Sequence, residues 1–124
     1  MSKVSGIGGL FFRARDPKAL AAWYERHLGI SDLHKAVWNQ EAGDTIFGPF
    51  SHDTNYFGRP EQQWMINFRV EDLDTMIADL KASGITVETR VEWDSEVGRF
   101  ARIHDLEGNP IELWEPAAQK RPEA

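Results

Sequence analysis

The sequence predicts an α+β fold built from two βαβββ modules, and three observations support this prediction. Each half of the chain begins with a strand-like segment that leads into a capped helix. Each helix is followed by a glycine and then by further strand-like segments. The matching landmarks are Phe12-Arg13 and Phe68-Arg69, Asp16 and Asp72, and Gly29-Ile30 and Gly84-Ile85. We therefore expect a single domain over residues 1–124, with one module at about 5–60, a second at about 62–116 and a frayed tail at 117–124.

The first module has a well-marked helix between weaker strand signals. Asp16 is a favoured N-cap residue and Pro17 a favoured first helical residue, so a helix is expected to begin here and to end before Gly29. Apolar residues recur along it at spacings of three and four, which gives it one face to pack on a sheet. The other expected segments are a strand at 6–13, short strands at 35–40 and 44–50, and a loop at 51–60.

The second module repeats this order with clearer strands. Asp72 is the expected N-cap of a helix over residues 73–83, which Gly84 ends. The strand before the helix is expected at 64–70. The strands after it are expected at 85–93, 98–105 and 109–115, the last one following the turn Glu107-Gly108-Asn109.

The composition excludes several classes of protein. There is no cysteine, so disulfides and thiolate metal sites are ruled out, and a reducing cytoplasmic location is expected. A net charge of -6 without a basic cluster argues against nucleic acid as a partner, since the only terminal basic pair is Lys120-Arg121. No apolar run is long enough to cross a membrane, and the N-terminus lacks the features of a secretory signal. The 5 tryptophans and 7 phenylalanines suggest that some aromatic side chains line a pocket.

Three stretches resemble the vicinal oxygen chelate superfamily, which includes glyoxalase I, bleomycin resistance proteins and extradiol dioxygenases. They are the two module starts, GIGGLFFRARDPKALAAWYERHLGI and WMINFRVEDLDTMIADLKASGI, and the ending RIHDLEGNPIELWE. The resemblance covers nearly the whole chain. It implies that the two modules form a curled mixed sheet, a cup with the helices outside and a ligand or metal site inside. It also implies a homodimer, which would cover exposed sheet edges.

The alternation of strand residues predicts which side chains enter the cup. Phe11 and Arg13 are expected there from the first strand, and Asn67 and Arg69 from the strand before the second helix. From the last strand, Glu112 and Trp114 are expected to point inward.

The resemblance also implies where a metal would be held. Metal-dependent members place a ligand, usually His, at the positions of Gly9 and Met65, and a Glu at the position of Glu112. Glycine has no side chain and a thioether suits soft metals, so we expect no metal and no other cofactor. A divalent metal at a rearranged site of His52, His104 and Glu112 stays a minor alternative.

Glu112 leaves two interpretations open. In an apolar cup beside Trp114 it could act as a catalytic general base, or it could form a structural ion pair with Arg13 or Arg69.

The two arginines likewise have two possible roles. They could bind an anionic molecule while Trp38, Trp93 and Trp114 stack on its flat part, with His52 at the entrance; alternatively, they form salt bridges at strand ends.

Two functions are therefore predicted. The first is a glyoxalase-like or bleomycin-resistance-like protein that binds a small molecule in the cup without the usual metal. The alternative is a metal-dependent lyase or isomerase of the glyoxalase type, with a rearranged site around Glu112. Whether the protein is an enzyme is left open by the sequence.

Overall fold

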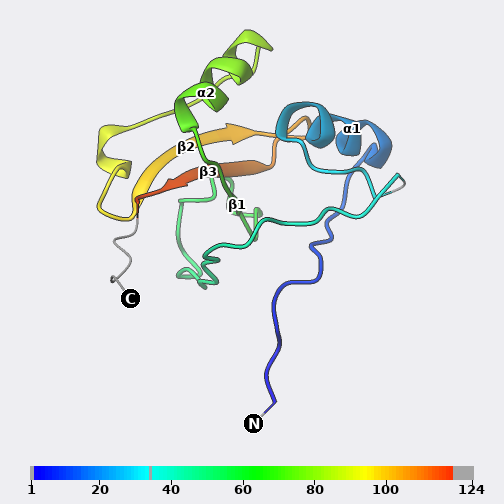
Figure 1. Cartoon of the computed structure of the whole chain (residues 1–124), viewed down its shortest axis with the longest axis horizontal. Coiled ribbons are helices and arrows are strands. Elements are labelled where there is room, and N and C mark those ends of the chain that lie inside the picture. The colour runs from blue at the N-terminus through cyan, green and yellow to red at the C-terminus, as the bar shows by residue number, and fades with distance from the viewer. Residues whose placement is uncertain (1, 34, 119–124) are drawn as a thin grey trace.

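The protein is a small α+β structure with two helices and an open three-stranded mixed sheet (Figure 1). The computed structural model describes residues 2–33 and 35–118. His34 and most of the predicted tail, including Lys120-Arg121, lie outside these residues. The elements are α1 (Pro17–Leu28), β1 (Ile66–Arg69), α2 (Leu73–Ala82), a short 3-10 helix η1 (Val91–Trp93), β2 (Gly98–His104) and β3 (Pro110–Pro116).

Both helices begin where the sequence predicts, because the predicted caps form. The Asp16 carboxylate accepts a hydrogen bond from the backbone N–H of Ala19 at 3.1 Å, and Asp72 accepts one from Thr75 at 3.1 Å. Gly29 ends α1 in the left-handed conformation with φ of 70°, which costs glycine little.

The sheet has the strand order β1-β3-β2. β1 runs parallel to β3, and α2 lies in the crossover that such a pair requires. β2 runs antiparallel to β3. The strand predicted at 85–93 is wrong for most of its length, since only an isolated bridge between Glu88 and Arg102 and the helix η1 occur there.

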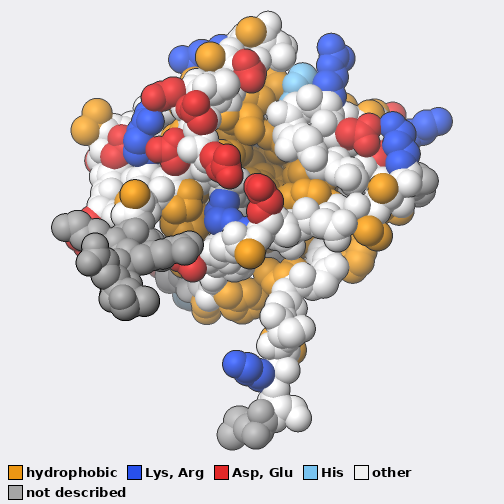
Figure 2. Space-filling view, in the orientation of Figure 1, with side chains coloured by type: hydrophobic (Ala, Val, Ile, Leu, Met, Phe, Trp, Pro, Cys, Tyr) orange, Lys and Arg blue, Asp and Glu red, His pale blue; other side chains and the backbone are white. Residues whose placement is uncertain are grey.

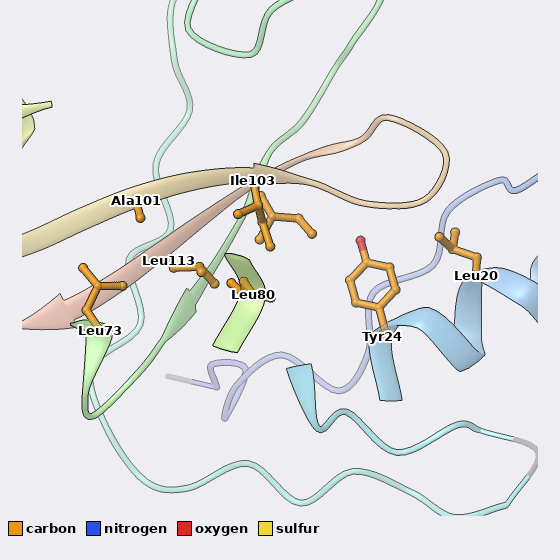
Figure 3. Packing of buried hydrophobic residues seen from close by; sticks show 8 residues of the cluster. Leu20, Tyr24, Leu73, Leu80, Ala101, Ile103 and Leu113 are labelled. Atoms are coloured by element: carbon orange, nitrogen blue, oxygen red, sulfur yellow. The ribbon is translucent and has the colours of Figure 1, made fainter. Parts of the chain in front are cut away.

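The core lies between the helices and one face of this sheet. Figure 1 shows both helices along the same side of the sheet, and Figure 3 shows their side chains directed at β2 and β3. Successive side chains of a strand point to opposite faces of the sheet, and the strand residues of this core are fully buried because they point toward the helices. The buried cluster consists of Leu20, Tyr24, Leu73, Leu80, Ala101, Ile103, Ile111 and Leu113.

The first half of the chain differs from the prediction. None of the described residues before β1 forms a strand, so the strands predicted at 6–13, 35–40 and 44–50 are wrong and the two-module cup is not confirmed. A strand forms by backbone hydrogen bonding to a neighbouring strand, and these described segments have no such neighbour here. Large hydrophobic side chains stay exposed as a result, among them Phe11 at 89% and Phe47 at 87%. Figure 2 also shows hydrophobic side chains open to the surface between the two helices.

Within the described residues, no helix is long and apolar enough to cross a membrane.

Candidate functional site

The face of the sheet opposite the core carries a line of polar side chains. In the strand register, Asn67 of β1 and Arg102 of β2 are the two neighbours of Glu112 on β3. The isolated bridge adds Glu88 on the outer side of Arg102. We call these four residues the polar row. They share one face because they alternate with the core residues on the same strands.

The Glu112 carboxylate is half-buried and is held by two neutral donors. The Tyr56 hydroxyl donates to its Oε2 atom at 2.5 Å, and the Asn67 amide donates to Oε1 at 2.8 Å. Burial and this hydrogen bond to Glu112 raise the pKa of Tyr56 to about 12. The pair therefore keeps the phenol protonated above the pH at which an ordinary tyrosine ionises.

Arg102 lies between two aromatic rings beside this carboxylate. Its guanidinium carbon is 4.4 Å from the centre of the Tyr56 ring and 5.6 Å from that of Trp93. Its Nη2 atom lies 3.4 Å from the sulfur of Met65. Its Nε atom is buried without a hydrogen-bond partner in the described chain. Arg102 also makes no ion pair with any described residue.

A cleft of about 350 Å³ extends to Met65, whose sulfur contacts Arg102 of the polar row, and we call it the loop cleft. The segment of residues 48–60, which also supplies Tyr56, forms one wall. Gln62 to Met65 form the other, and Met65 connects the cleft to Arg102. Phe50 stacks on Tyr56 with ring centres 5.8 Å apart, so the aromatic wall continues toward Glu112. His52 lines this cleft.

Phe11 and Arg13 lie apart from the polar row. Both line a second open cleft of about 620 Å³ together with Trp64. This cleft shares Gln62, Gln63 and Trp64 with the loop cleft, so the two adjoin.

Arg69 takes a structural position. It donates to the carbonyl oxygens of Glu41, at 2.8 Å, and of Asp44. Its guanidinium lies so close to Gly43 that a Cβ atom there would be 2.9 Å from it. Arg69 therefore fastens this turn to the edge of β1. Neither Arg69 nor Arg13 forms the predicted ion pair with Glu112.

The three predicted tryptophans lie in three different environments. Trp93 contacts Arg102 in the candidate site. Trp114 is only 8% exposed; its indole N–H donates to the Val97 carbonyl at 3.0 Å. Trp38 packs edge-on against Phe68 with ring centres 6.1 Å apart, and Phe68 packs against the core. The structure thus brings Glu112, Asn67 and Trp93 together but not Trp38.

Three residues of the site, Tyr56, Glu88 and Arg102, were missed by the sequence prediction. Alternation from the core residue Ile103 places Arg102 on the same face as Glu112, so this residue could have been found. Tyr56 comes from a loop, where no periodic pattern indicates which way a side chain points.

The residues around Glu112 do not fit a divalent metal. Within the described residues, no three His, Asp or Glu side chains lie close enough to hold one. The guanidinium of Arg102 brings a positive charge to the place where a metal would need negative or neutral donors. His104 is exposed at the end of β2, opposite Pro110.

Asp105 holds together the turn in the segment RIHDLEGNPIELWE, one of the stretches that carry the family resemblance. This buried carboxylate accepts hydrogen bonds from the Tyr24 hydroxyl at 2.7 Å and from the backbone and side chain of Asn109 at 3.0 and 2.9 Å. Glu107 accepts from the backbone N–H of Asp16 at 3.0 Å. The turn is thereby fastened to α1.

Comparisons with known proteins agree with this fold. The family model described as a glyoxalase-like domain matches residues 9–114. The crystal structure of TnmS3, an antibiotic binding protein from Streptomyces sp. CB03234, is similar with a TM-score of 0.62 and 18% sequence identity, covering 94% of this chain and 100% of TnmS3. No protein of curated function matches the sequence. The predicted resemblance is confirmed, and the chain belongs to the glyoxalase-like domain family of the vicinal oxygen chelate superfamily.

Proposed function

We propose that this protein binds a small aromatic molecule in the loop cleft, against the polar row, without a divalent metal. The observation that carries the proposal is the continuous wall from Phe50 through Tyr56 to Arg102, which ends at a hydrogen-bonded carboxylate. Small-molecule sites combine apolar walls with a few fixed polar groups in this way. The fold shared with TnmS3, an antibiotic binding protein, gives further support.

The arrangement of the polar groups suits binding. Each oxygen of Glu112 already accepts a hydrogen bond, one from the Tyr56 hydroxyl and one from the Asn67 amide, so the carboxylate is held in a fixed position. These bonds also fix the position of the Tyr56 ring against Phe50 and Arg102.

A metal-dependent lyase or isomerase is less well supported. It would need three donors, and no described group of three His, Asp or Glu side chains includes Glu112. A divalent cation there would also be repelled by Arg102.

We also propose a homodimer. The exposed hydrophobic side chains of the first half, such as Phe11, Val37 and Phe47, are more than an isolated soluble domain commonly leaves uncovered. The residues that line the adjoining cleft, Phe11 and Arg13, lie in this half. A second copy would cover this surface and could complete the ligand site.

Binding can be tested by calorimetric titration with planar aromatic compounds of different charge. Substituting Trp93→Leu removes one ring beside Arg102, so binding should weaken by about threefold to tenfold. Trp38→Leu is the matched control, because Trp38 contacts Phe68 instead, and should leave binding unchanged. Absence of binding by every compound would contradict the proposal.

The metal-free part needs its own measurement. Elemental analysis of protein purified without a histidine tag should find no stoichiometric divalent metal. A stoichiometric metal that disappears in Glu112→Gln would overturn this part and favour the lyase or isomerase.

A further inference from the structure

We infer that the ligand carries an oxyanion, such as a carboxylate attached to its aromatic part, and that Arg102 binds this group. The inference rests on the proposed function, because it names the chemical class of the ligand for the same site. Three features of the described residues lead to it.

The first feature is the fixed position of the guanidinium. Tyr56 and Trp93 lie at 4.4 and 5.6 Å from its carbon atom, and Met65 contacts one of its terminal nitrogens. An arginine held in this way loses little further side-chain entropy when it binds a ligand. It is therefore preorganised for a partner.

The second feature is the unused hydrogen-bonding capacity of Arg102. Its Nε atom is buried and has no acceptor among the described residues. A buried donor without an acceptor is costly, and an arriving oxygen would remove that cost. A carboxylate can accept from two guanidinium N–H groups at once, which a neutral ligand oxygen does less well.

The third feature is the charge of the surroundings. Glu88 is paired with Arg90 at 2.7 Å, and the carboxylate of Glu112 is hydrogen-bonded by Tyr56 and Asn67. Arg102 is then the member of the polar row whose charge has no direct partner among the described residues. Arg90 lies 5.4 Å from the Trp93 ring, so two cations border the same indole.

A cationic ligand fits this site poorly. The aromatic rings that would attract it already face Arg102, and a second positive charge would be repelled by Arg102. The negative net charge of the whole chain acts over the surface and does not change this local arrangement.

The test uses three naphthalene-sized probes of matched shape in calorimetric titrations of the full chain: 2-naphthoate, 2-naphthalenemethanol and N-methylquinolinium. Wild-type protein should bind 2-naphthoate about tenfold or more tightly than the other two. Arg102→Met should abolish this preference, whereas Arg102→Lys, which keeps the charge without the planar fork, should retain part of it.

Arg99→Met is the matched control. Arg99 lies on the same strand β2, but it is paired with Asp74 of α2 at 2.9 Å, on the helix side of the sheet. The control should bind 2-naphthoate like wild type. Circular dichroism and thermal melting of each variant would establish that it is folded.

The outcomes separate the two proposals. If the neutral or cationic probe binds as tightly as 2-naphthoate, or if Arg102→Met keeps the preference while folded, the inference about Arg102 is wrong and the proposed binding function stands. If no probe binds to wild-type protein, the proposed function itself is overturned. If Arg102→Met does not fold, a reduced preference in folded Arg102→Lys supports the inference, and full retention contradicts it.

Discussion

The two halves of the chain share their sequence landmarks but not their structure. The second half contains all three strands and most of the fully buried side chains. The first half contains one capped helix, and most of its large hydrophobic side chains outside that helix are exposed. A helix is specified by neighbours in the sequence, whereas a strand is completed only by another strand. Outside α1, the described residues of the first half therefore have no strand partner for their backbone, and many of their large apolar side chains are uncovered.

Two hydrogen bonds of the same kind join the halves. Tyr24 donates to Asp105 on the core side of the sheet, and Tyr56 donates to Glu112 on the other side. Each bond links a tyrosine of the first half to a carboxylate of the second half. The first half is therefore anchored by specific polar contacts in addition to the packing of α1.

The largest expected effect comes from the core of the second half. Leu113→Ala should lower the free energy of unfolding by about 2–5 kcal/mol, because the side chain is fully buried and leaves a cavity. Urea denaturation monitored by circular dichroism would measure it. Val91→Ala, whose side chain is 87% exposed, serves as the control and should change stability by less than about 0.5 kcal/mol. Equal effects of the two substitutions would contradict the assigned core.

The next largest effect concerns the link between the halves. Asp105→Ala should cost about 3 kcal/mol, since it leaves Tyr24 and Asn109 without their acceptor. Tyr24→Phe removes one of these bonds and should cost about 1 kcal/mol. Denaturation curves of the two variants would be compared at neutral pH. A larger cost for Tyr24→Phe than for Asp105→Ala would show that the turn does not depend on this carboxylate.

Much of the second half could be predicted from the sequence, and the reason is local. The caps Asp16 and Asp72 specify where the helices begin, and three of the four predicted strands form at β1, β2 and β3. The strand predicted at 85–93 does not form, apart from the bridge at Glu88. Outer strands depend on a single neighbour, so their length is hard to predict from their own residues.

The site was predicted only in part. Alternation in the strands placed Glu112 and Asn67 on one face, and they do meet. It could not assign Arg69, which binds the turn around Gly43 and thus depends on a segment far away in the sequence. Tyr56 lies in a loop, where the direction of a side chain follows from packing alone.

A pH titration would sharpen the role of the tyrosine links. The pKa of Tyr56 is raised from 10.0 to about 12 by burial and by its bond to Glu112, and burial also raises the pKa of Tyr24. The folded state thus favours the protonated phenols. Their contribution to stability is fully present below pH 10 and should be lost as the pH rises, for Tyr56 between pH 10 and about 12.

Tyr56→Phe should accordingly flatten the alkaline loss of stability. Urea denaturation between pH 8 and pH 11 would compare this variant with wild type. An unchanged pH profile would mean that the bond between Tyr56 and Glu112 does not persist in solution.

The proposed homodimer predicts a smaller effect, on assembly instead of folding. Phe47→Asp should shift the protein toward monomer in sedimentation velocity experiments, because Phe47 belongs to the uncovered surface of the first half. Val91→Asp is the matched control, since Val91 is equally exposed, at 87%, but lies in the second half. A wild-type protein that stays monomeric at high concentration would contradict the dimer.

The smallest effects are expected at surface ion pairs, where the difference between the halves should vanish. Lys35–Glu25 in the first half and Arg99–Asp74 in the second each join a well-exposed side chain to a partly exposed one, with a nitrogen–oxygen distance of 2.9 Å. Solvent and salt screen such pairs, so neither Glu25→Gln nor Asp74→Asn should shift the urea midpoint measurably. A clear shift in only one variant would indicate that its pair is buried in solution. If that variant were Glu25→Gln, the shift should grow with protein concentration, since covering Lys35 and Glu25 would then require a second copy of the chain.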